Sequence, residues 1–465
     1  MKHENQHRPG VRRRKRKQAS DRVLLDGQKI SLRSVNDLQN YSHNPRKHDA
    51  RQIGQLKNSI SAFGFMNPII VDAAGIVIAG HGRLQAAVEL GLQKVPVIAA
   101  AHLSEAKVRA YRLADNKIAE NSSWDEGLLR IELAALVDLE FSGDLEFDVD
   151  AIGFETAELD ILLGDDPEDD KPEVVEGPSE TAVCRSGETW VLGEHQIACM
   201  SALEGESYRT LLNGNTPSLI ITDPPYNVPV RGHIRTSTSA KHREFAMASG
   251  EMSSSEFADF LTRALGHSVS TAVAGTVMMS FIDWRHLREL DTACSNLGLE
   301  QINLCVWVKT SGGMGSLYRS QHELCAIYKL PGANNVNNVR LVAMGRNRTN
   351  VWRYSGVNTF GRNRAADLVD HPTVKPVAMI EDAIKDVTKI GDYVLDSFGG
   401  SGTTLLAAER SRRRARLLEI DPLYVDVTIR RWQDVTGGEA YKLGTEETWN
   451  ERRARPSGPL PGQED

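Results

Sequence analysis

The sequence lacks the features that would place it in a membrane or outside the cell. No apolar stretch among its 465 residues is long enough to span a bilayer, and the arginine-rich beginning has no apolar secretory segment. Only five cysteines are present, an odd number without a C-x-x-C pair, which is typical of reduced thiols in a cytosol. We therefore expect a cytoplasmic protein with no membrane partner.

Two common phosphate-binding patterns are also missing. The glycine-rich segment 396–404 has no lysine after Gly402, which excludes the G-x-x-x-x-G-K-[S/T] loop, and it does not fit the dinucleotide pattern G-x-G-x-x-G. It nevertheless follows an apolar run and precedes a helical pattern, so its glycines let the backbone approach a ligand beside the free N–H groups of a helix start. A predicted strand at 415–421 then ends in Glu419 and Asp421, where a carboxylate suits a ribose diol. Together these segments predict a nucleoside cofactor without a pyrophosphate.

A second candidate site is the tetrapeptide Asp223-Pro224-Pro225-Tyr226. It closes the apolar run 219–222, which is short and β-branched and is therefore predicted to be a buried strand. Proline fixes φ and cannot donate to a ladder, so the strand ends in a stiff turn at a carboxyl edge of the sheet. There Asp223 and the Pro224 carbonyl can accept the N–H groups of an amino group on a base that stacks on Tyr226. A purely structural Pro-Pro turn is the alternative.

Taken in order, Asp223–Tyr226 and Asp396–Thr404 resemble an amino-group DNA methyltransferase of the circularly permuted β class, in which the catalytic motif precedes the cofactor motif. The resemblance covers residues 184–437. Further segments that carry it are Trp307–Lys309, Gly312–Gly315, Tyr318–Glu323 and His371–Pro376. One departure is Met200-Ser201-Ala202, where relatives often carry an acid before the catalytic strand, and it leaves the adenine-side contacts to the cofactor open.

The resemblance implies a Rossmann-like α/β methyltransferase fold, S-adenosyl-L-methionine as the cofactor, and a target base flipped out of double-stranded DNA. It gives catalytic roles to Asp223, Pro224, Pro225 and Tyr226. The aspartate at the first motif position favours adenine N6 over cytosine N4 as the methylated atom. The implied cofactor-binding residues are Asp396, Phe398, Gly400, Gly402, Thr403, Thr404, Glu419, Asp421, Thr373 and Lys375.

Residues 21–140 are predicted to form a separate, small α/β domain with a helical extension. An apolar helical face at 53–63 precedes two short apolar runs, 68–71 and 76–79, which predict a hairpin. With Asn44-Pro45-Arg46 and Gly80-His81-Gly82-Arg83, the unit resembles the ParB-like (ParB/sulfiredoxin-like) N-terminal domain. That family places its phosphate-handling loop at the second motif. The candidates for a nucleotide or DNA-phosphate site are therefore Asn44, Arg46, Gly80, His81 and Arg83, and a scaffold role is the alternative.

Charge and composition divide the rest of the chain. Residues 1–20 are a basic tail that is predicted to be disordered, either solvated or binding phosphates as an arm. Residues 141–180 are rich in acids and prolines, which predicts a linker and explains much of the net charge of −7. The methyltransferase-like domain is expected at 181–440, with strands and helices alternating around a mainly parallel sheet. A polar tail is expected at 441–465.

Two arginine-containing segments are candidates for DNA contact. Residues 228–254 are predicted to be a mobile loop beside the catalytic motif. Residues 331–370 mix arginine, asparagine and aromatic residues, and Arg and Asn are the side chains that read guanine and adenine edges. In the β-class order, target recognition falls in this second segment. The candidates are Arg231, Arg235, Arg346, Arg348, Arg353, Arg362 and Arg364, with ordinary solvated loops as the alternative.

We therefore predict a site-specific DNA methyltransferase of the restriction-modification type that methylates N6 of adenine. The alternatives are an N4-cytosine methyltransferase, a ParB-like DNA-binding or regulatory protein whose methyltransferase half is inactive, and a nuclease in the first domain. The expected partners are double-stranded DNA, a second copy of the chain, and a nucleotide at the ParB-like domain. No metal is required, because the cofactor itself carries the reactive methyl group.

Overall fold

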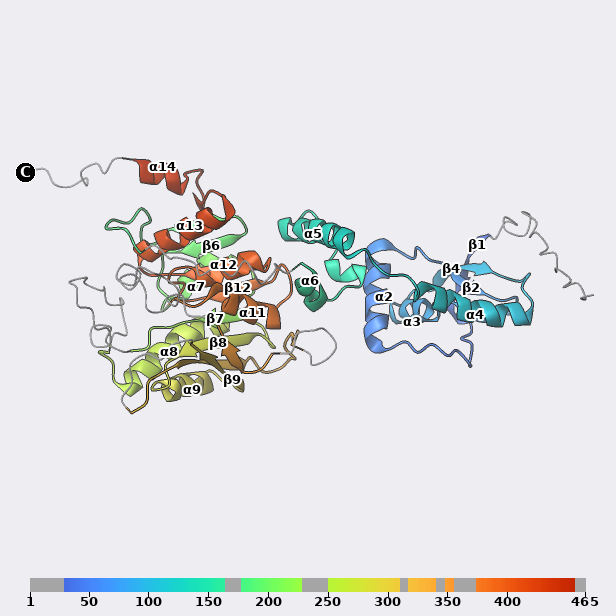
Figure 1. Ribbon diagram of the computed structural model, residues 1–465, viewed down its shortest axis with the longest axis horizontal. Coiled ribbons are helices and arrows are strands. Elements are labelled where there is room, and N and C mark those ends of the chain that lie inside the picture. Colours follow the sequence, from blue (N-terminus) through green and yellow to red (C-terminus); the bar gives the residue numbers. More distant parts are fainter. Residues whose placement is uncertain are drawn as a thin grey trace, which may run out of the picture. The chain divides into compact units, whose positions relative to one another are not determined.

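The computed structural model describes residues 29–163, 177–227, 250–309, 317–339, 348–354 and 374–455. The chain divides into two units, Met1–Asp125 with Phe147–Gly153, and Glu126–Glu146 with Phe154–Asp465; Figure 1 draws both. Within the described residues, no helix has the length and apolar character needed to cross a membrane. The expected basic tail and six predicted site residues fall outside the described ranges, namely Arg231, Arg235, Arg346, Arg362, Arg364 and Thr373.

The first unit contains a four-stranded sheet in the order β1-β4-β2-β3. The predicted hairpin is confirmed, since β2 and β3 pair antiparallel, and Asp72 closes the turn by accepting hydrogen bonds from the backbone N–H groups of Ala74 and Ile76, both at 2.9 Å. Side chains of β2, β3 and β4 form the core together with Leu84 of α3. The elements are β1 (Ile30–Ser34), η1 (Val35–Asp37), α2 (Ala50–Phe63), β2 (Ile69–Val71), β3 (Val77–Ala79), α3 (His81–Glu89), β4 (Lys94–Ala99), α4 (Glu105–Ala119) and η2 (Val149–Ile152).

The second unit contains a ten-stranded sheet in the order β11-β9-β10-β8-β7-β12-β13-β6-β5-β14. The central strands β8, β7, β12, β13 and β6 run parallel, as predicted, and antiparallel pairs extend the sheet through β10 and β5. The strands are β5 (Thr189–Leu192), β6 (His195–Ala198), β7 (Leu219–Thr222), β8 (Val277–Ile282), β9 (Glu300–Val308), β10 (His322–Lys329), β11 (Val351–Arg353), β12 (Tyr393–Asp396), β13 (Arg414–Leu418) and β14 (Tyr441–Lys442).

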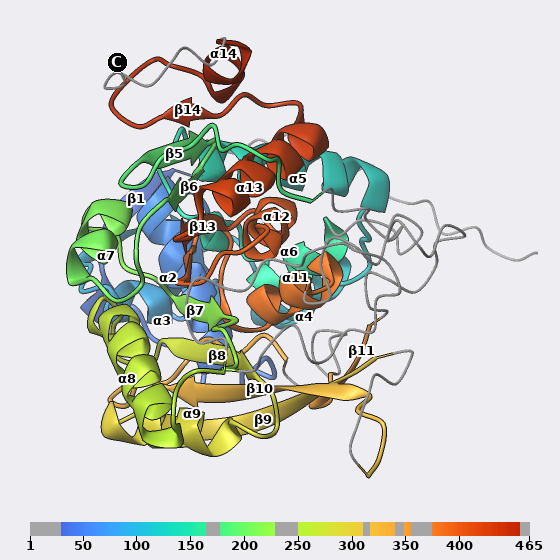
Figure 2. The same cartoon turned by 90° about the vertical axis from the view of Figure 1, so that its left-hand side faces the viewer.

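Helices cover both faces of this sheet. Successive side chains of a strand point to opposite faces, so the fully apolar run of β7 supplies Leu219 and Ile221 to one core and Ile220 to the other. Figure 2 shows α7 and α8 on one side of the strands and α11, α12 and α13 on the other. The helices are α5 (Glu126–Ser142), α6 (Thr156–Leu162), α7 (Gly205–Leu212), α8 (Ser254–Ser270), α9 (Leu287–Asn296), α11 (Val377–Val387), α12 (Thr403–Arg410), α13 (Pro422–Thr436) and α14 (Trp449–Ala454).

The folded parts extend beyond the boundaries expected from composition. Helix α6 lies in the segment expected to be linker, and its Asp160 forms a bidentate ion pair with the fully buried Arg413, at 2.7 and 3.1 Å. Strand β14 and helix α14 lie in the expected polar tail, where Trp449 is 2% exposed and donates its indole N–H to Asp426 at 2.8 Å. Both segments are therefore anchored to the core of the second unit.

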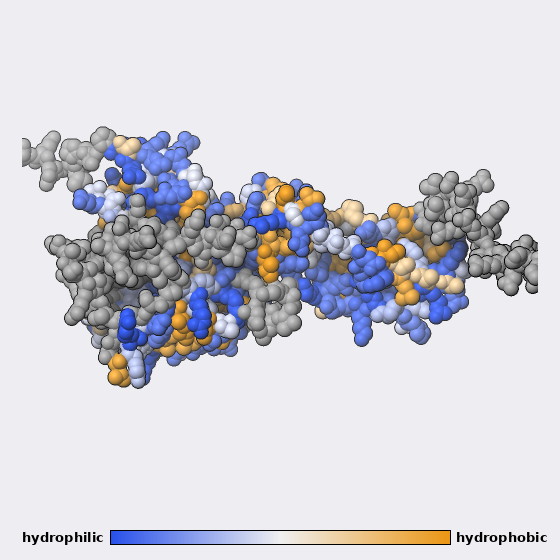
Figure 3. All heavy atoms as spheres, viewed as in Figure 1, coloured by the Kyte–Doolittle hydropathy of each residue, from blue (hydrophilic) through white to orange (hydrophobic). Residues whose placement is uncertain are grey.

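Helix α5 packs on one side only. Its Leu133 and Val137 are buried, whereas Leu128, Ile131 and Leu139 on other faces are exposed. In Figure 3, apolar side chains gather on the surface over this helix. The helix is held to the rest of its unit by Asp138, which pairs with Arg412 at 2.9 Å.

Candidate active site

The sheet brings the two predicted motifs to neighbouring strands. Strand β7 ends at Thr222, directly before Asp223, and β12 ends at Asp396. The strands pair in parallel, with Val394 opposite Leu219, so both motifs leave the sheet at the same carboxyl edge. That edge is where open α/β sheets bind ligands. The structure therefore joins segments that are far apart in the sequence into one site.

Both carboxylate oxygens of Asp223 accept hydrogen bonds from side chains. The Tyr226 hydroxyl donates to Oδ1, and Lys375 Nζ donates to Oδ2 at 2.5 Å. Burial, together with the neighbouring Asp223 and Glu323 carboxylates, raises the pKa of Tyr226, which keeps the hydroxyl protonated as a donor. Each carboxylate oxygen can accept two hydrogen bonds, so with respect to the described residues one position on each oxygen is left for a ligand.

Lys375 lies between two carboxylates of the site. Its ammonium pairs with Asp223 and lies 3.2 Å from a Glu323 oxygen, and only 6% of its side chain is exposed. Its predicted place beside the cofactor stays a prediction. Burial opposes its charged form, but the two carboxylates outweigh that effect and raise its pKa. Lys309 adds a second ammonium that pairs with Glu323. The site thus contains two acids and two lysines with balanced charge.

Glu323 and Lys309 were quoted for the resemblance without a role in the site. They meet because β9 and β10 pair antiparallel, with His322 opposite Val308, so the end of β9 lies beside the start of β10. The opposite charges at these strand ends, combined with a predicted hairpin, are the signal that could have identified the pair.

The cofactor motif forms a turn that is held by its own acids. Asp396 accepts the backbone N–H of Phe398 at 3.0 Å and the Thr404 hydroxyl at 2.6 Å, and burial raises its pKa to about 6. Glu419 accepts the backbone N–H of Gly400 at 2.8 Å. Burial and nearby carboxylates raise the pKa of Glu419 to about 7. The predicted residues of the turn are therefore assembled around two carboxylates.

Space at the turn fits a ligand that approaches the backbone. A Cβ at Gly400 would meet no atom closer than the Phe398 carbonyl oxygen at 4.0 Å, so its open side faces no packed side chain. Gly402 is different, because a Cβ there would lie 2.5 Å from Thr428. Gly402 is the N-cap residue of α12, with a φ of +83°, and Thr403 is the first residue of that helix. Asp421 caps α13 by accepting the backbone N–H of Leu423 at 3.0 Å, a structural role in addition to the predicted one.

Two of the predicted DNA-contacting arginines are described by the structure. Arg348 lies 3.1 Å from Asp386 and 3.4 Å from Asp382, and it donates to the Tyr354 hydroxyl at 3.0 Å. Its guanidinium is therefore engaged with side chains of the protein, and its predicted contact with DNA stays a prediction. Arg353 is exposed on β11, at the edge of the sheet.

The candidate phosphate residues of the first unit fall into two groups. Gly80, with φ of +98°, precedes α3, and Arg83 and His81 lie beside it. Among the described residues, the buried His81 Nε2 and Arg83 Nε have no hydrogen-bond partner. Burial and the nearby Arg112 lower the pKa of His81 to about 4, so its ring is neutral at pH 7. Arg46 instead pairs with Glu120 at 3.0 Å, and Asn44 accepts the Arg46 backbone N–H at 3.3 Å.

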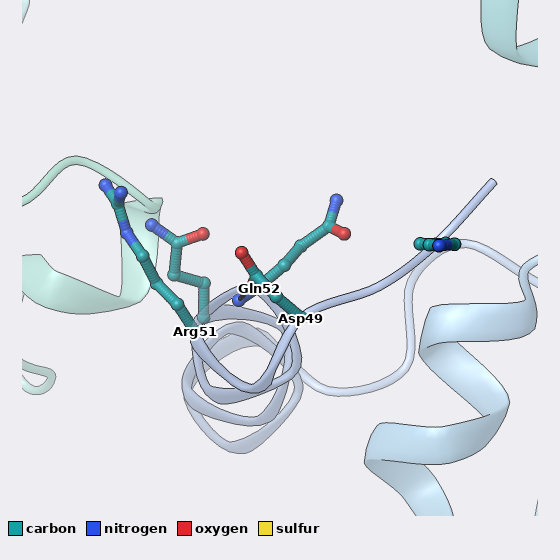
Figure 4. A pocket seen from close by; sticks show the side chains of 5 residues that line it. Asp49, Arg51 and Gln52 are labelled. Atoms are coloured by element: carbon teal, nitrogen blue, oxygen red, sulfur yellow. Dashed lines mark hydrogen bonds between the residues drawn. The ribbon is translucent and has the colours of Figure 1, made fainter. Parts of the chain in front are cut away.

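A polar hollow also lies over the start of α2, and Figure 4 shows Asp49, Arg51 and Gln52 on its wall. Lys47 and Gln55 complete the lining. This hollow contains none of the candidate phosphate residues. Within the described ranges, no cluster of three or more His, Cys, Asp or Glu side chains could hold a metal ion.

Comparisons with known proteins match three segments of the chain. Residues 218–430 match the family described as DNA methylase, residues 19–117 match the ParB N-terminal domain, and residues 127–186 match the ParB-methyltransferase HTH domain. The last match covers nearly all of α5, which was expected to extend the first domain, and α6, which was expected to be linker.

Individual relatives match the same two parts of the chain. A ParB-like nuclease domain-containing protein, YnaK of Escherichia coli K12, is 44% identical over 17% of this chain and 88% of its own length. A putative methylase, YubD of the same strain, is 28% identical over 46% of this chain and 81% of its own. The type II methyltransferase M.HpaI of Haemophilus parainfluenzae is 23% identical over 51% of this chain and 74% of its own.

Proposed function

Because the chain belongs to the N6/N4 DNA methylase family and joins its methylase domain to a ParB N-terminal domain, we propose that it methylates N6 of adenine in double-stranded DNA. The observation that carries the proposal is the parallel pairing of β7 with β12, which places Asp223–Tyr226 beside Asp396–Thr404 at one carboxyl edge. The choice of adenine over cytosine rests on the resemblance of the motif, which begins with aspartate.

The cofactor is S-adenosyl-L-methionine, and the turn after β12 suits it. We assign the ribose hydroxyls to Glu419 and the approach of the backbone to the open side of Gly400. Phe398 and Thr403 complete the turn. When bound there, the cofactor supplies an electrophilic methyl group beside the catalytic motif.

The protein's own part is to position the target amino group. The open acceptor positions of Asp223 and the Pro224 carbonyl take its two N–H groups, which draws the nitrogen lone pair out of conjugation with the ring. The partly buried Tyr226 ring provides a stacking surface for the flipped base, and flipping costs a few kcal/mol of unstacking. The Asp223 carboxylate is an acceptor at the same site that can take the proton that the nitrogen loses. Positioning of this kind is a large part of enzymatic rate enhancement.

For the first unit we propose a phosphate-bearing ligand at the start of α3. The supporting observation is the pair of buried, unpartnered nitrogens of His81 and Arg83 next to the left-handed Gly80, within the described residues. Arg46 is less suited to that role because Glu120 already pairs with it. We also propose that the protein acts in the cytoplasm, where its DNA substrate is found.

The test is methylation of unmethylated plasmid DNA by the full chain, followed by mass spectrometry of the released nucleosides. N6-methyladenine is the expected product, and N4-methylcytosine would refute the choice of base. Asp223→Ala should lower turnover by at least ~10²-fold, the scale for removing an orienting group from a preorganised site. Its affinity for S-adenosyl-L-methionine should stay within a few-fold of the wild type. A variant that methylates at the wild-type rate would show that the catalytic site lies elsewhere.

A further inference from the structure

The ion-pair network around Asp223 has no role in the function proposed so far. It runs from Lys309 through Glu323 and Lys375 to Asp223. Its members come from separate parts of the fold: Lys309 follows β9, Glu323 belongs to β10, Asp223 follows β7, and Lys375 precedes α11. A side chain that joins such distant segments at a catalytic carboxylate can control where that carboxylate points.

The surroundings of Lys375 restrict its ammonium to one place. Nζ lies 2.5 Å from Asp223 Oδ2, 3.2 Å from Glu323 and 3.3 Å from the Tyr226 hydroxyl. The rings of Tyr226 and Phe281 lie 5.7 and 5.1 Å away, within the range of cation–π attraction. A buried ammonium is costly unless it is paired and hydrogen-bonded, and here two carboxylates and two rings surround it.

Glu323 holds this arrangement from the other side. Burial disfavours its charged form, but the ammonium groups of Lys375 and Lys309 outweigh that effect and lower its pKa. Glu323 is therefore ionised at neutral pH and attracts Lys375 toward β10, while Asp223 attracts it toward β7. Lys309 balances the extra negative charge of Glu323. The ammonium is thus fixed between two anions instead of following Asp223 alone.

We propose that Lys375 and Glu323 are positioning residues for Asp223, and this proposal rests on the methyl-transfer function proposed above. Lys375 occupies one acceptor position of Oδ2 and the Tyr226 hydroxyl one of Oδ1, so the carboxylate cannot rotate about its Cβ–Cγ bond without breaking both contacts. Its remaining acceptor positions then face the target amino group in a fixed direction. Lys375 acts through Asp223 and not through the cofactor.

The test compares Lys375→Gln, Lys375→Arg and Glu323→Gln in the full chain, with plasmid DNA and S-adenosyl-L-methionine as substrates. Lys375→Gln should lower kcat by about 10²-fold, the scale of a misplaced reacting group, with little change in the KM for DNA. Its affinity for S-adenosyl-L-methionine, measured by calorimetry, should stay near that of the wild type. Lys375→Arg should recover part of the loss because it keeps the charge, and Glu323→Gln should lower kcat in the same direction by a smaller factor.

Two controls separate positioning from a structural role. Lys385→Gln removes a partly buried lysine that pairs with Glu381 on α11, away from Asp223, and it should keep the wild-type kcat. Thermal unfolding of every variant shows whether the fold is retained, and Lys375→Arg serves as the folded comparison if Lys375→Gln unfolds.

The decisive measurement is Lys375→Gln in the Asp223→Ala background. If Lys375 acts through Asp223, the double variant should be no slower than Asp223→Ala alone. A further loss in the double variant, or a loss of cofactor affinity at unchanged kcat, would overturn the positioning role and leave the proposed function intact. Wild-type turnover by Asp223→Ala would overturn the proposed function itself, and the positioning role with it.

Discussion

Gly402 offers a test of the cofactor turn whose magnitude follows from the structure. In Gly402→Ala the new Cβ would lie 2.5 Å from Thr428 Cγ2 and 2.7 Å from its Oγ1, in a backbone with φ of +83°. The left-handed conformation costs an alanine about 1–2 kcal/mol, and overpacking at a buried site costs about 1–3 kcal/mol. Thr428 is 1% exposed and cannot move into solvent. The free energy of unfolding should therefore fall by about 2–5 kcal/mol.

Gly437→Ala is the matched control, because Gly437 has φ of +69° but nothing within 4 Å of a Cβ built on it. It should lose only the conformational part, about 1–2 kcal/mol. Adding Thr428→Ala to Gly402→Ala removes the two shortest contacts and should recover part of the loss, which a double-mutant cycle measures.

Urea unfolding followed by tryptophan fluorescence reports on the correct unit, because six of the seven tryptophans belong to it, namely Trp190, Trp284, Trp307, Trp352, Trp432 and Trp449. If Gly402→Ala is no less stable than Gly437→Ala, the close approach of the turn to α13 is refuted.

Three further predictions concern other parts of the second unit. Asp160→Ala leaves the buried Arg413 without its counter-ion and should lower the free energy of unfolding, measured in urea, by about 3–5 kcal/mol. Asp138→Ala removes a carboxylate whose side chain is 65% exposed and should lower it by at most about 1 kcal/mol. Equal losses in the two variants would contradict the difference in burial. The pKa of Glu419 is raised to about 7, so the carboxylate is protonated below that pH and ionised above it; calorimetric affinity for S-adenosyl-L-methionine should rise as pH increases through 7, and Glu419→Gln should show a flatter profile. If Arg353 contacts a base, Arg353→Ala should reduce the free energy of DNA binding by about 1–3 kcal/mol and relax the base preference at one position of a randomised-site library. If Arg353 contacts a phosphate, the variant should instead bind all DNA sequences more weakly by the same factor.

Much of the fold was predictable because, along the central strands, the apolar residues of the sequence are the residues that the structure buries. A short apolar run followed closely by two prolines predicts a buried strand with a rigid end, and β7 is that strand. The hairpin of β2 and β3 was predictable for a similar reason, since Asp72 makes its turn with residues close to it in the sequence.

The parts that sequence reasoning missed depend on partners far along the chain. Helix α6 has an acidic composition that resembles a linker, and only Arg413, distant in sequence, makes it part of the fold. The acids that pair with Arg348 lie on α11, distant from it in sequence, so its local sequence did not predict this pairing. The direction of a long side chain such as Lys375 is set by the carboxylates that surround it, and the local sequence carries no record of them.

The pairing of β7 with β12 also has a consequence for how such a protein can change over time. Everything between Thr222 and Tyr393 is a closed excursion whose two ends are fixed on adjacent strands. The entropy of closing a loop grows only with the logarithm of its length. The excursion contains Asp223, Lys375 and strands β8 to β10, so residues can be gained or lost at little thermodynamic expense only in the loops between these elements. Such loops can vary in length while the pairing of β7 with β12 keeps Asp223 and Asp396 at the same edge of the sheet.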